Sequence, residues 1–533
     1  MRNYVLGYGL VAGFAAAATS AAAQTSLPEI VVTAPSPIVQ TTAASGVPAG
    51  EPAPRSPLPA IVGDTYAPVT VLTADEIART TGATLGDTLF TTPGVTGNTF
   101  APGASRPIIR GLDNARVRVQ ENGIGSMDVS TISEDHAVPF DPLVTDRLEV
   151  VRGPATLRFG PQAIGGVVAA SNNRIPDPTT PLGVHGLFKG AWGSADNNRE
   201  GAVSVDARGA NAAMHADFFR RASDDYAIPG GGRQANTAVD AQGMSLGGTV
   251  YLPNGFIGVA ISNYTSLYGI PGVEAAANNT RIDLNQTRLT SRGEFRTGGD
   301  VVDTVRFWLG GTVYKHDELA GANEIAATFR NREFEGRTEA QFVPINTGFG
   351  VLTTAVGIQG GLQKLATSGE AGSLLAPAET NRVAAYIFNE LAVTPAFRLE
   401  GAARIGHVGV TGTAAQFPAG LLPDGSDVPE IARSRSFVPG SASVAAIRDL
   451  PFGLQATGSV SISQRPPEAQ ELFSKGPHEA SGTFEIGNPD LGKEQATSFE
   501  LGLRRTKGDF RFEASVFHTR YSGFIYKRLT GAT

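Results

Sequence analysis

The feature that most constrains this chain is a two-residue alternation that recurs from about residue 180 onward. Between Phe452 and Ile462 every second residue is apolar or glycine, and residues 499–503 and 510–516 repeat the pattern. Side chains of a β-strand point alternately to its two faces, so each run predicts a strand with one apolar face. Runs of about ten such residues are typical of strands that cross a membrane within a β-barrel.

The connections between these runs alternate in length. Short turns are predicted near 209–211, 252–255, 298–301, 343–348, 394–396, 450–453 and 506–509, and longer loops near 223–241, 267–281, 316–332, 362–380, 409–435 and 464–495. In bacterial outer-membrane barrels the short turns are periplasmic and the long loops face outward. The spacing predicts about 15 antiparallel strands, an odd number where a closed bacterial barrel has an even one.

The composition agrees with such strands and excludes several other classes of protein. Charged residues make up 17% of the chain, against about 25% in soluble domains, and mean hydropathy is −0.05. The chain has no cysteine, which excludes a disulfide scaffold, a thiolate metal site and a cysteine nucleophile. A net charge of −7 and a pI near 5.6 do not indicate a nucleic-acid partner.

The N-terminus, Met1–Ala23, has the pattern of a cleaved signal peptide. Arg2 precedes the apolar run Tyr4–Ala18, and alanines at 21–23 offer a cleavage site before Gln24. A helix needs about 20 apolar residues to span a bilayer, so this run is too short for a membrane anchor. The sequence therefore predicts export from the cytoplasm.

Residues 24–60 read as a flexible arm rich in proline and alanine. Leu27–Pro35 is a short apolar, β-prone stretch on this arm. Such a stretch is suited to adding a strand to the sheet edge of another protein.

Residues 61–177 predict a separate α+β unit. Thr73 and Glu76 have the spacing of a capping box at the start of a helix, and 107–112, 116–120 and 146–154 read as short strands. Arginines and acidic residues are frequent in this unit, which suits polar contacts inside a wet barrel better than an apolar seam.

Three motifs of this unit resemble those of a known family. Ile109–Leu112 (IRGL), Glu149–Pro154 (EVVRGP) and Gly160–Gly166 (GPQAIGG) are similar to the recurring motifs of the plug domain of TonB-dependent outer-membrane receptors. Leu27–Pro35 then resembles the TonB box of that family. The box residues are Leu27, Pro28, Glu29, Ile30, Val31, Val32 and Thr33.

The resemblance implies a transmembrane β-barrel (180–533) with an N-terminal α+β plug (61–177) in its lumen. Family barrels have 22 strands, so about 15 strands imply a C-terminally truncated chain with two bare sheet edges. It also implies a monomer in the lipid of the outer membrane that imports a scarce substrate. TonB and its inner-membrane energising complex would drive that import, and the chain would not be an enzyme.

The chain has seven histidines, and most fall near the predicted outward side. Without cysteine, histidine nitrogen and carboxylate oxygen are the donors that a borderline metal ion would find. Asp135 and His136 are adjacent in a plug loop, where they offer one oxygen and one nitrogen, and Glu134 and Asp141 add negative charge. A turn cap is the plain alternative for this pair.

Three segments resemble the zinc-receptor branch of the family, the ZnuD-like type: Ser126–Asp141, Tyr314–Ile325 and Phe473–Asn488. The resemblance implies that zinc is the transported substrate rather than a resident cofactor. The ligands that it implies are Asp135, His136, Glu324 and His478, with Glu318 close to Glu324. The loop at 268–279, which matches a histidine-rich loop of that branch, has no histidine, so weak capture sites are not expected.

Other readings stay open. Haem or a ferric siderophore would be imported by the same machinery, and His478 could serve as an axial haem ligand or simply lie in a solvated loop. A passive porin would lack the plug motifs and the TonB box, and an exported soluble β enzyme would not need them.

Overall fold

The computed structural model describes residues 38, 60–61, 65–80, 82–153, 156–416, 429–478, 483–505 and 510–529. The predicted signal peptide and Leu27–Pro35 lie outside the described residues. Among the described helices, none has the length and apolar character needed to cross a membrane.

The N-terminal unit is built on a six-stranded sheet of order β1-β2-β7-β8-β5-β6. Its strands are β1 (Ala60–Ile61), β2 (Val69–Thr73), β5 (Val117–Glu121), β6 (Ile124–Gly125), β7 (Arg147–Arg152) and β8 (Gly166–Ser171). β5 and β8 run parallel, and the other pairs are antiparallel. Val150 and Val168 are fully buried on the face that packs against the helices α1 (Ala74–Thr80) and α2 (Leu85–Leu89).

Helix α1 begins where the capping pattern predicts. The backbone N–H of Thr73 donates to the Glu76 carboxylate at 2.8 Å, and the Thr73 hydroxyl donates to the same oxygen at 3.0 Å. The bond from the Thr73 N–H to the Glu76 side chain is one of the two bonds of the predicted capping box.

The rest of the chain forms one long antiparallel sheet. Its strands are β9 (Gly183–Gly193), β10 (Asn198–Arg208), β11 (Ala212–Ser223), β12 (Val239–Leu252), β13 (Gly255–Gly269), β14 (Arg281–Arg296), β15 (Val302–Ala320), β16 (Glu324–Phe342), β17 (Ile345–Thr347), β18 (Gly350–Gly369), β19 (Ala378–Thr394), β20 (Phe397–Ala415), β21 (Glu430–Phe437), β22 (Gly440–Leu450), β23 (Leu454–Arg465), β26 (Glu494–Arg505) and β27 (Phe512–Ser522).

These seventeen described strands occupy fifteen positions in the sheet. β16 and β17 both pair with β18, and β21 and β22 both pair with β20, so each of these pairs is one interrupted strand. The predicted number of strands is therefore confirmed.

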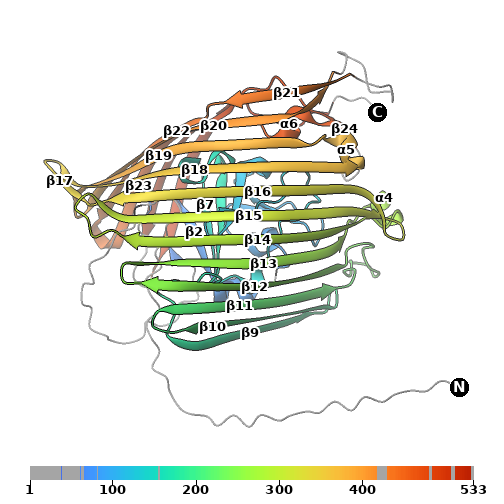
Figure 1. The fold of residues 1–533 in the computed structure, drawn as a ribbon, viewed down its shortest axis with the longest axis horizontal. Coiled ribbons are helices and arrows are strands. Elements are labelled where there is room, and N and C mark those ends of the chain that lie inside the picture. The colour runs from blue at the N-terminus through green and yellow to red at the C-terminus, as the bar shows by residue number, and fades with distance from the viewer. Residues whose placement is uncertain are drawn as a thin grey trace, which may run out of the picture. The chain divides into compact units, whose positions relative to one another are not determined.

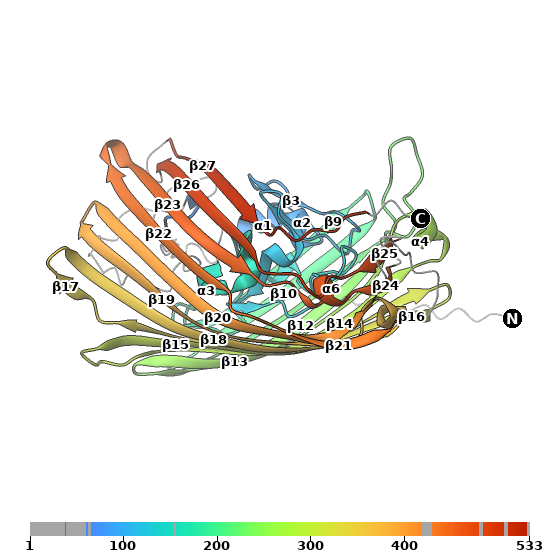
Figure 2. The same cartoon turned by 90° about the horizontal axis from the view of Figure 1, so that it is seen from above.

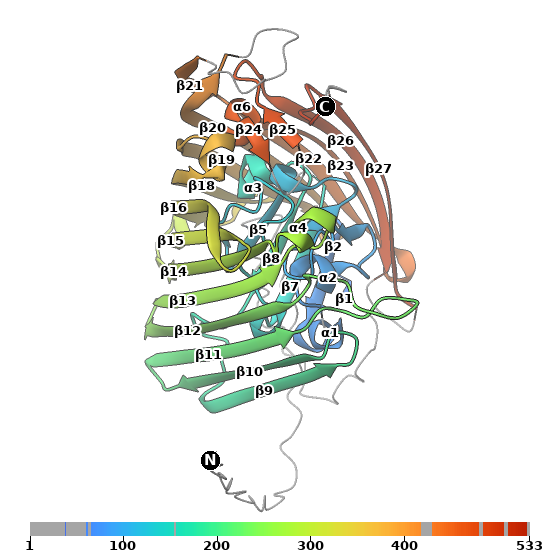
Figure 3. The ribbon, with the colours of Figure 1, turned by 90° about the vertical axis from the view of Figure 1, so that its right-hand side faces the viewer.

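The sheet curves around the N-terminal unit, which lies inside it (Figures 1 and 3). The outermost strands are β9 and β27. β9 pairs with β10, β27 pairs with β26, and no described residue of one edge strand pairs with the other. The predicted open barrel is confirmed, and Figure 2 shows the curved sheet from above.

The sheet presents an apolar outer face and a polar inner face, as the alternation predicts. In β12, Met244, Leu246 and Val250 are exposed, whereas Ser245 and Thr249 are buried toward the inside. This arrangement places apolar side chains where a barrel meets lipid.

One predicted loop is wrong, and two others are shorter than predicted, because residues 362–369 belong to β18 and residues 409–415 pair with β21. The segment 316–332 is not a long loop, because β15 and β16 each extend over 19 residues and leave only Gly321–Asn323 as a turn. Ala320 pairs with Glu324 at the tip. Continuing the ladder satisfies backbone N–H and C=O groups that a loop would leave to water. Gly321, at φ 52°, supplies the left-handed conformation that the tight turn needs.

The two ends of the sheet differ in the length of their connections. The short-turn end carries 209–211, 253–254, 297–301 and 451–453, and the long-connection end carries 224–238, 270–280 and 466–493.

Candidate functional site

The loop 126–141 of the N-terminal unit is held against the barrel strands at the long-connection end. The Tyr268 hydroxyl of β13 donates to the carbonyl of Asp135 at 2.8 Å and accepts from the N–H of Ala137 at 3.0 Å. Gln286 of β14 donates to the carbonyl of Ser126 at 3.0 Å. Because these contacts bracket it on both sides, His136 is presented to the barrel wall in a fixed position.

His136 meets His316 and Glu318, which both come from β15. Nε2 of His136 lies 3.4 Å from Glu318 Oε1, and Nε2 of His316 lies 3.7 Å from the same oxygen. One donor atom from each residue lies within 4.8 Å of the other two. In this cluster (His136, His316 and Glu318) the two histidines are 1% and 0% exposed, whereas the Glu318 side chain is 19% exposed.

The opposite nitrogen of each ring has its own partner. Nδ1 of His136 lies 3.2 Å from the carbonyl of Val129, and Nδ1 of His316 lies 2.8 Å from the Tyr314 hydroxyl. Such partners orient imidazole rings that bind metal. Phe329 packs against both rings, with centroids 4.8 Å apart in each case. Nε2 of His316 is buried and makes no hydrogen bond within the described residues. This nitrogen is therefore available as a metal ligand.

Asp135 stands beside the cluster. Its Oδ1 lies 3.9 Å from Nε2 of His136 and accepts a hydrogen bond from the Ser133 hydroxyl. Burial opposes the charged form of His136, but the carboxylates of Asp135 and Glu318 outweigh it and raise the pKa of His136 to about 9. At neutral pH His136 therefore carries a proton, which a bound metal ion would have to replace.

The structure brings together only part of the ligand set that the sequence predicts. Asp135 and His136 are at the cluster. Glu324 is exposed at the tip of the β15–β16 turn and is not a member of it. His478, in β24 (Lys475–His478), is buried and pairs through Nδ1 with Glu485 of β25 (Thr483–Ile486) at 2.7 Å.

Asp141 has other partners than the predicted ion. Its carboxylate caps the short helix η2 (Pro142–Val144) by accepting from the N–H of Leu143 at 2.8 Å, and it lies 3.4 Å from Arg221 of β11.

The sequence prediction did not assign His316 or Glu318 as ligands. A signal for them was present, because Tyr314, His316 and Glu318 are spaced two residues apart. On a strand that spacing places all three side chains on one face. Treating the segment as a loop concealed it.

Ion pairs join the N-terminal unit to the barrel wall. Arg110 makes two hydrogen bonds to Glu500 of β26, at 2.6 and 3.1 Å. Arg118 donates to both oxygens of Glu335 of β16, at 2.6 and 2.7 Å. The predicted polar interface is thus observed, with the arginines mostly on the N-terminal unit and their carboxylates on the barrel.

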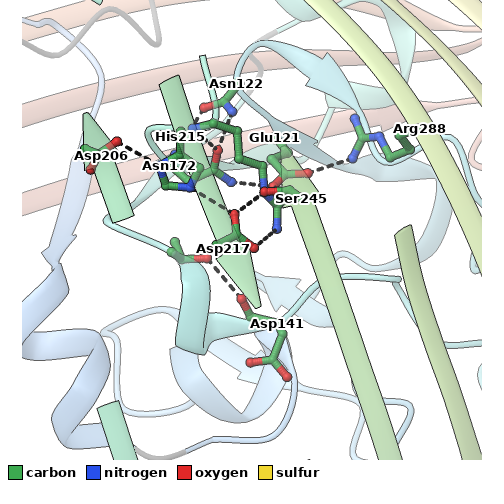
Figure 4. Close-up of polar contacts among 11 residues, drawn as sticks. Glu121, Asn122, Asp141, Asn172, Asp206, His215, Asp217, Ser245 and Arg288 are labelled. Atoms are coloured by element: carbon green, nitrogen blue, oxygen red, sulfur yellow. Dashed lines mark hydrogen bonds and ion pairs between the residues drawn. The ribbon is translucent and has the colours of Figure 1, made fainter. Parts of the chain in front are cut away.

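Figure 4 shows a further part of this interface. His215 of β11 lies between Asp206 of β10 and Asp217, at 2.8 and 3.0 Å. Arg174 donates to Asp217 at 3.0 Å and to Glu121 of the N-terminal unit at 2.6 Å. The inner wall and the N-terminal unit are therefore linked by charged contacts here, in addition to the apolar cluster in which Val129 and Ile132 of the plug pack with Tyr268 and Phe329 of the barrel.

Two family models match the chain. A TonB-dependent receptor plug domain matches residues 62–167, and a TonB-dependent receptor-like β-barrel matches residues 208–533.

Solved structures with the same fold include a copper transporter, OprC, at 17% identity and a TM-score of 0.68, covering 84% of this chain and 71% of the other. A hemophore receptor of Serratia marcescens, HasR, solved with its hemophore and heme, matches at 15% identity and a TM-score of 0.71, covering 86% and 73%. A ferric-catecholate import receptor of E. coli K12, Fiu, matches at 17% identity and a TM-score of 0.65, covering 87% and 76%.

These proteins are receptors and transporters rather than enzymes, and receptors of this class reside in the outer membrane and work with TonB. With its plug, its barrel strands and the two family matches, the chain belongs to the TonB-dependent receptor family.

Proposed function

We propose that this receptor imports the divalent metal ion zinc. The ion docks at His136, His316 and Glu318. The observation that carries the proposal is the convergence of two imidazole nitrogens and one carboxylate oxygen within 4.8 Å, with Nε2 of His316 making no hydrogen bond among the described residues. Two histidines and one carboxylate form a common zinc-binding set, and they leave a coordination position open.

The position of the cluster supports a transport role. One ligand, His136, comes from the plug, and two come from the barrel wall. A plug movement would separate His136 from the other two ligands and so weaken the binding of the ion. By family analogy TonB would cause that movement by pairing with Leu27–Thr33, after removal of Met1–Ala23 as the signal peptide and insertion of a monomer into the outer-membrane lipid.

The test is calorimetric titration of zinc into the full chain in detergent. His136→Ala and His316→Ala remove ligands, and each is expected to weaken zinc binding at least about 100-fold, since even losing a ligand's supporting partner costs about 10–100-fold. His185→Ala is the matched control, because His185 is exposed and its ring bonds to the carbonyl of Leu182, far from the cluster residues on β15. Unchanged affinity in both ligand variants would refute the assignment.

The same titration separates the present cluster from the ligand set inferred by resemblance. Glu318→Gln is expected to act as strongly as the histidine variants, and Glu324→Gln is expected to leave the affinity unchanged. The reverse result would place the ion at the tip of the β15–β16 turn.

Competition experiments between zinc and other substrates are needed to identify the substrate. The copper transporter among the similar structures makes copper a real competitor, because histidine and carboxylate donors bind Cu²⁺ more tightly than Zn²⁺. The hemophore receptor makes haem another. Uptake of labelled zinc by cells that is abolished by His316→Ala supports zinc, whereas uptake of haem or of a ferric siderophore that needs this residue would replace it.

A further inference from the structure

A cavity lies at the short-turn end, between the plug sheet and strands β12–β16. Its volume is about 800 Å³, and its lining includes the turn 252–255 together with residues of β5, β7 and β8. A cavity of about 300–1,000 Å³ accommodates a small organic molecule. No residue of the zinc cluster lines it.

The lining of this cavity is strongly basic. Seven arginines and three carboxylates contribute to it. Such a surplus of one charge sign, enclosed by protein, raises the local concentration of ions of the opposite sign. A free divalent cation is disfavoured here, whereas an anion is attracted.

Arg337 of β16 has donors to spare. It is 3% exposed, and its Nε and Nη1 make no hydrogen bond in the described part of the chain. Its Nε lies 3.5 Å from Glu339. That carboxylate already accepts two bonds from Arg158 at 3.2 Å and one from the Tyr386 hydroxyl at 2.7 Å. Buried donors without partners are costly, so the arrangement has capacity for an acceptor from outside the chain.

Neighbouring groups hold this guanidinium in place. Arg337 lies over the ring of Trp308 of β15, with its central carbon 4.3 Å from the ring centroid. Stacking on an aromatic ring orients a guanidinium while its edge stays available for hydrogen bonds. The Nε atoms of Arg208 and Arg292, which also line the cavity, are likewise buried without a hydrogen bond among the described residues.

We propose that this cavity binds a small organic anion through its carboxylate or phosphate groups, with Arg337 as the central donor. Guanidinium groups match the planar or tetrahedral oxygens of such groups through paired hydrogen bonds. The proposal is independent of zinc binding, since it uses other residues at the other end of the lumen.

The experiment uses the fluorescence of Trp308. The chain has two tryptophans, and Trp192 is 69% exposed on β9. Trp192→Phe therefore leaves Trp308 as the single reporter, directly beneath Arg337. Citrate and pyrophosphate are titrated separately into this metal-free full-chain variant in detergent, with sodium chloride at matched ionic strength as the blank.

Saturable fluorescence changes are expected with at least one of the two probes and not with chloride, and whichever probe binds more tightly identifies the preferred oxyanion. In the same background Arg337→Gln is expected to weaken binding at least about tenfold, since a charged hydrogen bond is lost. Arg220→Gln, at an exposed pair with Asp240, is the matched control and should change nothing.

Arg296→Gln guards against a variant that fails to fold. Arg296 lines the cavity but is exposed, so its loss should leave the fold intact and weaken binding about threefold by charge alone. Equal titrations in Arg296→Gln, Arg337→Gln and Arg220→Gln, or a response to chloride as large as that to both probes, would overturn the proposal. Unchanged zinc affinity in Arg296→Gln would show that the two sites succeed or fail separately.

Discussion

Strand β15 passes two regions of the lumen that have opposite character. Near its long-connection end, His316 and Glu318 meet His136 of the plug, and the site has two imidazoles and nearby carboxylates. Eight residues earlier, about 27 Å along a strand, Trp308 lies in a cavity where arginines outnumber acids. The first region provides a histidine nitrogen that can bind a metal cation. The second provides guanidinium N–H groups that can donate hydrogen bonds to an anion.

The lumen therefore offers two different kinds of site, a histidine–carboxylate cluster near one end and an arginine-rich cavity near the other. Between the two regions, Arg118 of the plug donates to both oxygens of Glu335, whose register partner on β15 is Gly310. Buried pairs of this kind are weak evidence for stability, because desolvation offsets their attraction. We therefore locate function where a buried polar atom without a hydrogen bond also lies in a ligand cluster or a cavity, as at Nε2 of His316 and at Arg337.

The largest effect is expected from removing the imidazole of His316, which tests whether the two regions bind their ligands independently. His316→Ala should weaken zinc binding at least about 100-fold and leave the binding of citrate or pyrophosphate at the arginine cavity unchanged. Calorimetry for zinc and Trp308 fluorescence for the anion measure the two effects on one preparation. If both ligands were lost together, the two regions would form a single coupled site.

Zinc binding at the cluster is also expected to depend on pH. The pKa of His136 is raised to about 9, so this imidazole holds a proton at neutral pH and zinc must displace it. Affinity is then expected to rise about tenfold per pH unit between pH 7 and 8, and to level off near the pKa. Calorimetry in buffers of different ionisation enthalpy would count the released proton. An affinity that stays flat from pH 7 to 8 contradicts a protonated His136.

A smaller effect is expected from the residue that holds the plug loop. Tyr268→Phe removes the hydroxyl that bonds to both Asp135 and Ala137. Losing it should cost about 1–2 kcal/mol locally, seen as faster hydrogen exchange in 126–141 and about tenfold weaker zinc binding. Tyr226→Phe, at an exposed tyrosine, is the control. Equal exchange in the two variants would show that the loop is positioned by other contacts.

The smallest effect is predicted for a charge pair outside both regions. Arg220 and Asp240 lie 2.7 Å apart, with side chains 48% and 50% exposed. Arg220→Gln should change the free energy of unfolding by less than about 1 kcal/mol and alter neither ligand affinity. A larger loss in thermal unfolding would show that this pair stabilises the fold more than its exposure predicts.

Alternating residues allowed much of this architecture to be predicted. The two-residue period and the turn spacing predict fifteen strands, and the motifs at 109–112 and 149–154 predict the plug. The site was harder to predict from the sequence, because its ligands lie on a strand and on a plug loop that meet only in the tertiary structure. His136 was predicted, since it stands next to Asp135 in a loop. His316 was missed because β15 and β16 extend into what read as a loop, and ladder pairing across 302–342 is not encoded in any local motif.

The binding of zinc at His136, His316 and Glu318 is tested most directly by anomalous diffraction at the zinc edge, from crystals of the full chain grown with zinc. We expect a single strong peak about 2.0–2.2 Å from Nε2 of His136, Nε2 of His316 and a carboxylate oxygen of Glu318. A peak bound by Glu324 and His478 instead, or no ordered zinc near His136, would contradict it.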